Sequence, residues 1–302
     1  MIQRSILAGA SALALAFVTN AAAAQDTAQD PSDVMPESAH DFVTMMLGMT
    51  PDGLLEYESI EANGDEGFVM LGAVMTPPGE EESILVNRIE VDRMDWIAIM
   101  ADEEPSFLTA TISGIDIPAA LFEEEIGDIG YDFGDRVAAD VAIDYERDDQ
   151  AVDLRDFAIT IPDVIGLALA LDAQGIPGAE KLENPMMAAG TARLANFSLR
   201  LEDFGGLADI IAASAEQFGM DREEALTMVR AQAPMAQMML QGERGSEIAA
   251  ALMAIVEDLP NLSNPITLSL SPDQPVTMAD FMTATEQDPE MVITRMGLGL
   301  DY

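Results

Sequence analysis

Cysteine is absent from the 302 residues, and the chain has a single histidine, His40. Without cysteine the chain forms no disulfide and no thiolate metal site, so core packing has to supply its stability. One histidine also excludes a zinc site built from several histidines. A histidine base needs a partner within hydrogen-bond reach and a shielded site. His40 instead adjoins a polar segment, so we do not expect it to be catalytic.

Catalytic signatures are missing as well. The sequence contains no G-x-S-x-G elbow, no Walker loop and no dinucleotide fingerprint. Its 55 Asp and Glu residues show no spacing that would locate an acid/base pair of the glycosidase kind. The sequence therefore predicts no catalytic, cofactor-binding or metal-binding residue, and a carboxylate-dependent envelope hydrolase stays open as an alternative.

Positive charge is scarce: 13 Lys and Arg residues face those 55 acids, and Lys181 is the one lysine. The net charge of −42 repels nucleic-acid phosphate and anionic lipid headgroups, which excludes nucleic-acid binding through a basic patch. Such a charge favours solubility through self-repulsion, and it also fits a salty medium that screens this repulsion.

The N-terminus has the three parts of a secretory signal. Arg4 is followed by an uncharged apolar run at 6–18 and then by Ala22, Ala23 and Ala24. The run is shorter than the roughly 20 residues of a membrane anchor. We expect residues 1–24 to be cleaved and the protein to be periplasmic. It would not be a lipoprotein, because no cysteine follows.

Alternating apolar residues predict strands from about residue 54 to 202. Early candidates lie near 54–61, 67–76, 83–91 and 106–117, and clearer ones at 137–145, 152–161, 165–171 and 195–202. In 152–161 the apolar phase changes between Leu154 and Phe157, which predicts a β-bulge near Arg155 and Asp156. Short turns between these strands favour an antiparallel meander.

Helical spacing is expected in two places. Ser38 and Asp41 resemble a capping box that opens a short helix. After residue 205 we expect three helices, the first with an apolar stripe from Leu207 to Phe218. The second begins at Asp221, carries Leu226 and Val229, and is interrupted or kinked at Pro234. The third begins at Ser246 and ends at Pro260. A strand at 266–270, a short helix at 278–283 and an extended segment from 291 onward close the chain.

These elements predict an α+β fold, a curved antiparallel meander with a C-terminal group of helices packed on one face. Residues 25–52 form a leader with the short helix, and 53–302 a single domain. That domain divides into the meander (53–203), the helical segment (204–260) and a closing strand-helix-strand segment (261–302).

Two groups of side chains need a separate interpretation. The acidic residues Glu123, Glu124, Glu125, Asp128, Asp132 and Asp135 lack the pattern of a calcium loop, which favours a solvated acidic edge. The methionines Met45, Met46, Met49, Met235, Met238 and Met239 could bind Cu(I), but they also fit apolar helix faces, so we expect them to fill the core.

The stretches 129–171 and 264–300, which begin IGYDFGDRVAADV and NPITLSLSPDQPV, resemble uncharacterised exported proteins of Gram-negative bacteria. The resemblance carries no catalytic signature. The meandering strands are also similar in architecture to periplasmic lipid-handling proteins, an analogy that does not determine function.

The function expected from these features is non-enzymatic: binding of a lipid or another apolar ligand in a groove between the sheet and the 205–259 helices. One alternative is an envelope assembly factor that binds another protein through its acidic surface or a sheet edge. Another is an outer-membrane barrel, because Met296, Leu298, Leu300 and Tyr302 alternate like a closing strand, although the helices and an aromatic content of 5% disfavour it.

Overall fold

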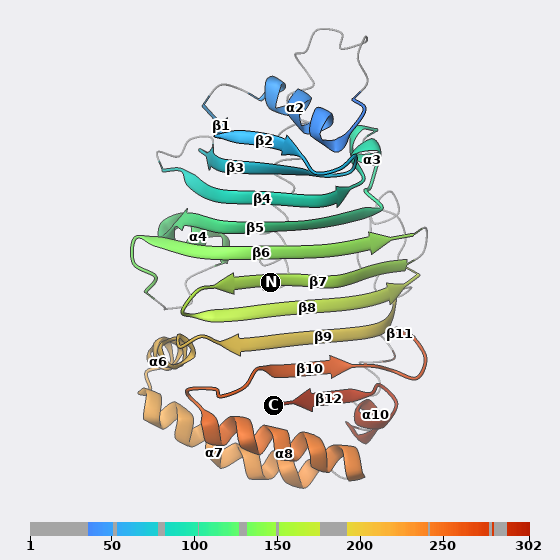
Figure 1. Ribbon diagram of the computed structural model, residues 1–302. Helices are drawn as coiled ribbons and strands as arrows, with labels where there is room; N and C mark the ends of the chain where they lie inside the picture. The colour runs from blue at the N-terminus through green and yellow to red at the C-terminus, as the bar shows by residue number, and fades with distance from the viewer. Residues whose placement is uncertain are drawn as a thin grey trace. The chain divides into compact units, whose positions relative to one another are not determined.

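The computed structural model describes residues 36–50, 53–77, 82–101, 103–126, 132–148, 151–175, 192–240, 242–277, 280 and 289–302. The expected signal at 1–24 and Lys181 lie outside these ranges, as does most of the expected helix at 278–283. The predicted fold class is confirmed: the fold is α+β, with a mostly antiparallel sheet that does not close on itself (Figure 1). None of the described helices is long and apolar enough to cross a membrane.

The chain divides into two compact units, residues 1–144 (unit 1) and 145–302 (unit 2). The single domain expected over 53–302 stays a prediction. In unit 1 the strand order is β1-β3-β4-β5-β6, and β2 also pairs with β3. The strands are β1 (Leu55–Glu56), β2 (Ser59–Ala62), β3 (Phe68–Met75), β4 (Ile84–Met94), β5 (Phe107–Pro118) and β6 (Arg136–Arg147).

The core of unit 1 lies on one face of its strands, under helix α2 (Ala39–Met49). The predicted cap is confirmed, because the Ser38 hydroxyl accepts a hydrogen bond from the Asp41 amide. Phe42 of α2 stacks on Trp96, with 6.3 Å between ring centroids. Trp96 opens α3 (Trp96–Met100), a one-turn helix that was not predicted, and α4 (Ala119–Ile126) was not predicted either.

In unit 2 the strand order is β7-β8-β9-β10-β12, and β11 pairs with β9. The predicted bulge is confirmed, because the β7–β8 register shifts between Leu154 and Phe157. The strands are β7 (Ala151–Ile161), β8 (Ile165–Gln174), β9 (Arg193–Asp203), β10 (Ile266–Leu270), β11 (Val276–Thr277) and β12 (Leu298–Asp301).

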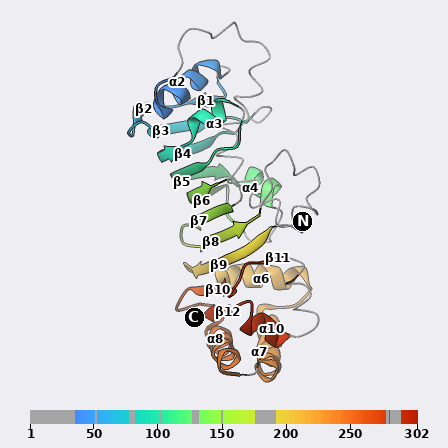
Figure 2. The same cartoon turned by 90° about the vertical axis from the view of Figure 1, so that its right-hand side faces the viewer.

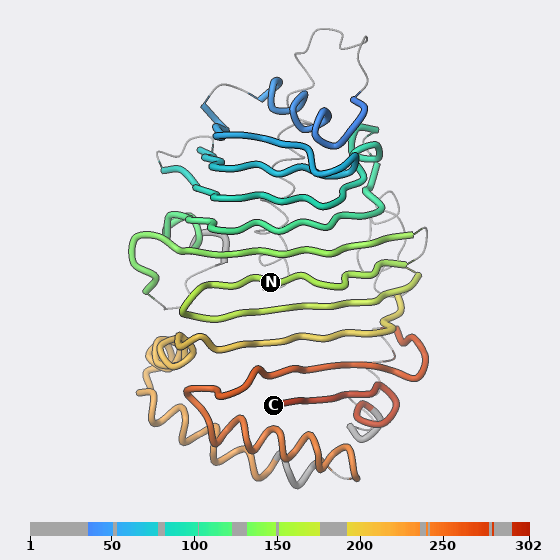
Figure 3. Tube along the Cα trace, in the orientation of Figure 1, coloured from blue at the N-terminus to red at the C-terminus, as the bar shows by residue number. Residues whose placement is uncertain are grey.

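Three helices of unit 2 lie in the chain between β9 and β10, which are neighbours in the sheet: α6 (Leu207–Gln217), α7 (Arg222–Met239) and α8 (Gly242–Asp258). The trace in Figure 3 leaves the end of β9, runs through these helices and returns to pair with the same strand. Helix α8 packs against α7 and against β12. A further helix, α10 (Pro289–Thr294), precedes β12.

Two predictions about these helices were wrong, and a third was wrong in part. Helix α8 begins at Gly242 and not at Ser246, whose hydroxyl donates a hydrogen bond to the Gly242 carbonyl inside the helix. Helix α7 runs through Pro234 without the expected interruption, while the alternative, a kink at Pro234, stays a prediction. The segment expected to be extended from residue 291 begins as part of α10.

Candidate functional site

One face of the unit 2 sheet is almost entirely apolar, because residues opposite one another in adjacent strands share a face. One row across the five strands is Phe157, Leu169, Leu199, Leu268 and Leu300. We call this whole apolar side of the sheet the leucine face. Besides the row just named it contains Leu154, Ile159, Leu167, Leu171, Phe197, Leu201, Ile266, Leu270 and Leu298.

The β7 bulge keeps this face continuous. Two residues of β7, Arg155 and Asp156, lie between the pairs Leu154–Leu171 and Phe157–Leu169, where β8 has only one residue. The extra residue changes the alternation, so that Leu154 and Phe157 point to the same side despite their odd spacing. Arg155 donates hydrogen bonds to Asp153 and Glu146 at the bulge.

The opposite face of the same strands carries small and polar residues. Ala168, Arg200 and Thr267 form one of its rows, and Ala170, Ser198 and Ser269 form the next. An ion pair within β9 joins Arg200 to Glu202 at 2.9 Å. The two faces of the sheet therefore suit different surroundings, water on one side and apolar groups on the other.

Most of the leucine face is only partly buried. Phe157 is 8% exposed, but Leu199 is 37% exposed, and Leu167, Leu169 and Leu268 have intermediate exposure. In unit 1 many core residues are almost fully buried, for example Met70 at 0%, although others there are partly buried. Apolar area that stays accessible on a sheet face is available to an apolar ligand.

Helices cover parts of this face. Val292 of α10, together with Met296, packs on Leu270 and Leu298 at one corner. Figure 2 shows α6 on the same side of the sheet as α10. Even in this corner Leu270 and Leu298 are only partly buried, like Leu169 and Leu268 of the central row.

Asp203 holds one end of the face in place. Its carboxylate accepts hydrogen bonds from the amides of Gly205 and Leu207 at 2.8 and 3.1 Å, and from that of Leu262 at 3.2 Å. Since Gly206, the residue before α6, provides no side-chain cap, Asp203 satisfies an amide of the first turn instead. One carboxylate thus fixes the end of β9, the start of α6 and the segment that leads into β10.

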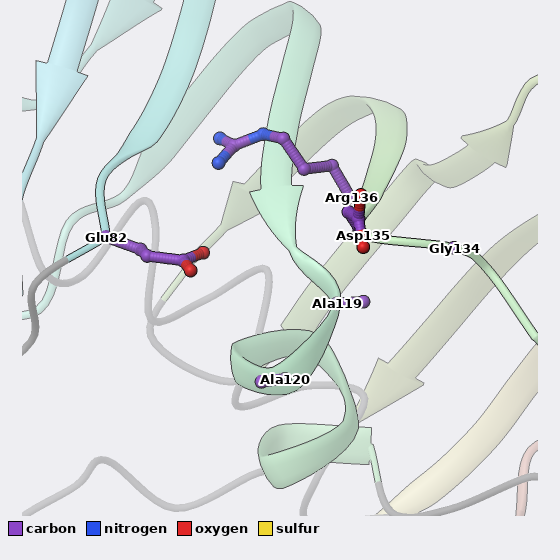
Figure 4. Close-up of a pocket in the computed structure, with 6 residues that line it drawn as sticks. All are labelled: Glu82, Ala119, Ala120, Gly134, Asp135 and Arg136. Carbon is purple, nitrogen blue, oxygen red and sulfur yellow. The ribbon is translucent and has the colours of Figure 1, made fainter.

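A second candidate is an open depression of about 530 Å³ in unit 1 (Figure 4). Glu82 and Asp135 line it, together with Ala119, Ala120 and Gly134. Its one cation, Arg136, donates hydrogen bonds to the Asp116 carboxylate at 2.7 Å and to the carbonyls of Ser83 and Asp116. Because this guanidinium already has protein acceptors, it is poorly placed to bind an anionic ligand.

The other polar residues singled out from the sequence are dispersed. The Nδ1 atom of His40 lies 3.4 Å from an Asp41 oxygen, and hydrogen bonds from Ser38 and then His40 lower the pKa of Asp41. Asp132 accepts a hydrogen bond from the Gly134 amide. The side chains of Glu123, Glu124 and Glu125 lie outside the described ones, as does Asp128. Within the described chain no three metal-ligating side chains cluster.

The methionines behave in two ways. Met45 and Met46 of α2 pack against the unit 1 core, as predicted, and Met49 is partly buried. Met235 of α7 is 57% exposed, so the prediction that it fills the core was wrong. The side chains of Met238 and Met239 are not among those described.

Two further residues of the expected helical stripes are also exposed. Val229, expected on the same helix as Leu226, is 43% exposed, and Phe218, which follows the last residue of α6, is 79% exposed. Of Phe218, Leu226 and Val229, only Leu226 is buried, with 2% of its surface exposed. The helical pattern of the sequence did not show which side of α7 is exposed.

A family model described as an uncharacterized protein matches residues 158–301. The match starts in β7 and ends in β12, so it includes most of the leucine face and all the helices of unit 2. No curated protein matches the chain. This match agrees with the resemblance of residues 129–171 and 264–300 to uncharacterised proteins, and it assigns no activity.

Proposed function

We propose that this protein is a non-enzymatic, exported binder of a lipid or another long apolar ligand, and that the ligand lies on the leucine face of unit 2. The observation that carries the proposal is a face of five strands with three apolar rows, in which all residues except Phe157 stay partly accessible. A lipid chain would remove this area from water, which is worth about 25 cal/mol per Å².

The dimensions of the face support an elongated ligand. Residues 165 to 171 of β8 extend along roughly 20 Å at about 3.4 Å per residue. Five strands spaced by about 4.8 Å give the face a width of roughly 19 Å. The strong negative charge of the chain favours an uncharged or zwitterionic headgroup over an anionic one.

The first test is mass spectrometry of the protein purified without detergent from its own periplasm. We expect a lipid in stoichiometric amount in the non-denaturing spectrum, and the bare chain after denaturing extraction. A bare chain in both spectra, with no binding of added diacylglycerol or phosphatidylcholine, would overturn the proposal.

Substitutions in one strand then locate the site. Leu199→Gln places an amide on the leucine face and should weaken binding of a fluorescent phosphatidylcholine about tenfold, which corresponds to about 1.4 kcal/mol. Ser198→Gln adds the same group to the opposite face of β9 and serves as the matched control. Equal affinities of the two variants would exclude the leucine face as the binding surface.

A further inference from the structure

Helix α7 has apolar residues on two opposite sides. Leu226 and Ala233 are 2% and 4% exposed and face the rest of unit 2, where α7 packs against α6 and α8. Met228 and Met235 have the same spacing of seven residues, yet they are 49% and 57% exposed. A helix that is apolar on both sides needs a second apolar surface to cover the outer one.

The outer side has the spacing of a helix that packs against another helix. Met228, Ala231, Gln232 and Met235 occupy positions i, i+3, i+4 and i+7, and all four are exposed. At 100° per residue they fall within about 100° of arc, on the side away from Leu226 and Ala233. We call these four residues the outer stripe. The small Ala231 at its centre allows a second helix to approach closely.

The charge distribution indicates which partner fits. The segment 225–242 contains no acidic residue, although Asp and Glu total 55 in the chain. Two copies that each carry a net charge of −42 repel one another, so they can come together only where acidic side chains are absent. The single cation of this segment, Arg230, donates a hydrogen bond to the Leu259 carbonyl within its own unit.

We propose that the outer stripe is the contact between two copies of this chain, with α7 packed antiparallel against α7 of the second copy. A two-fold interface needs a surface complementary to itself, which an uncharged stripe provides and a stripe of one charge does not. With the two-fold axis between Ala231 and Gln232, Met228 of each copy lies opposite Met235 of the other. Methionine suits this contact, because its flexible thioether adapts to its neighbours.

A stripe of four residues on one helix is smaller than the roughly 800 Å² per partner of a standard interface. The dimer should therefore be weak and depend on concentration. It should also strengthen with salt, because the screening length falls from about 10 Å at 0.1 M to about 3 Å at 1 M ionic strength.

The test is sedimentation equilibrium of the mature protein at increasing concentration and at two salt levels. We expect reversible dimers, more abundant at the higher salt. Met228→Glu places two like charges in the contact and should give a monomer throughout, with an unchanged circular dichroism spectrum. Ala250→Glu adds the same charge at an exposed position of α8 and should dimerise like the wild type.

The absence of cysteine allows a direct check of the geometry. Ala231→Cys places one thiol next to the proposed axis, where Cα atoms can approach the roughly 4.4–6.8 Å of a disulfide. Under mild oxidation it should give a covalent dimer much faster than Thr227→Cys, an exposed control on the same helix. A monomeric wild type at every concentration, or equal cross-linking of the two variants, would overturn the proposal. The proposal would also be overturned if the protein stayed monomeric and bound phosphatidylcholine vesicles in a way that Met228→Glu abolishes.

Discussion

At the scale of single residues, the hydroxyl of Tyr302 links the end of β12 to the helices of unit 2. It donates a hydrogen bond to the Asp258 carboxylate at the end of α8 and accepts one from the Ser263 amide at 3.1 Å. Desolvation, followed by the hydrogen bond to Asp258, raises the pKa of Tyr302. Hydrogen bonds from Tyr302 and then Ser263 lower the pKa of Asp258.

Replacing this hydroxyl should destabilise the protein in a pH-dependent way. A carboxylate whose pKa is lowered by folding stabilises the native state above its unfolded pKa of about 3.9, and this contribution disappears as the pH falls through the native pKa. Tyr302→Phe should therefore lower the free energy of unfolding near neutral pH, by an amount that shrinks below about pH 4. Urea unfolding across this range measures the difference, with Tyr57→Phe in unit 1 as the control. A loss that stays constant with pH would contradict the role of Asp258.

At the scale of elements, the alternation of apolar and polar residues predicted the strands better than the helical spacing of apolar residues predicted the helices. The residues of β6, β7, β8 and β9 alternate, so their ranges and the β7 bulge could be read from the sequence. The helix periodicity gave the positions of α6, α7 and α8 but not which side of α7 is buried, because Leu226 and Met228 lie on different apolar stripes of one helix. Only the tertiary contacts with α8 decide between such stripes.

The same reasoning explains why the leucine face could be predicted only in part. Its residues are visible in each strand, but the pairing of β9 with β10 across three helices, and of β10 with β12, depends on contacts distant in sequence. The one-turn α3 was missed because its apolar run, Trp96–Met100, is too short to show a period, and only its Asp95 cap marks it.

The bulge makes a specific prediction about β7. Deleting Asp156 removes the extra residue and leaves Leu154, Phe157 and Ile159 on the leucine face, so the variant should fold with a cost of about 1 kcal/mol. Deleting Ala158 instead moves either Phe157 or Ile159 to the polar face and should cost several times more. Thermal unfolding of the two variants compares them directly, and equal losses would mean that the bulge does not set the phase of the strand.

At the scale of the whole molecule, charge repulsion is the dominant electrostatic feature. With 13 Lys and Arg residues against 55 acids, most carboxylates have no cation to pair with. The ion pairs of the described residues, such as Arg88–Glu90 and Arg200–Glu202, are exposed and contribute little individually. A compact state with this charge is destabilised by self-repulsion, which salt relieves.

The melting temperature should accordingly rise by several degrees when NaCl is increased from about 0.01 M to about 0.5 M. The effect should nearly vanish near pH 4.1, the isoelectric point of the chain, where little net charge remains to be screened. Differential scanning calorimetry at both pH values provides the comparison. A melting temperature that falls with salt at neutral pH would mean that attractive ion pairs outweigh the repulsion.

The connection between β9 and β10 has a consequence for how the size of this fold can change. Residues 204–265, with α6, α7 and α8, form a single loop between two neighbouring strands, and Asp203 fastens its two ends through the amides of Leu207 and Leu262. The entropy of closing a loop grows only with the logarithm of its length, so a loop of half this length would close at a cost only ~0.6 kcal/mol lower. The free energy of pairing β9 with β10 therefore depends little on the length of the chain between them. This connection is the natural site in unit 2 for adding, shortening or exchanging whole segments.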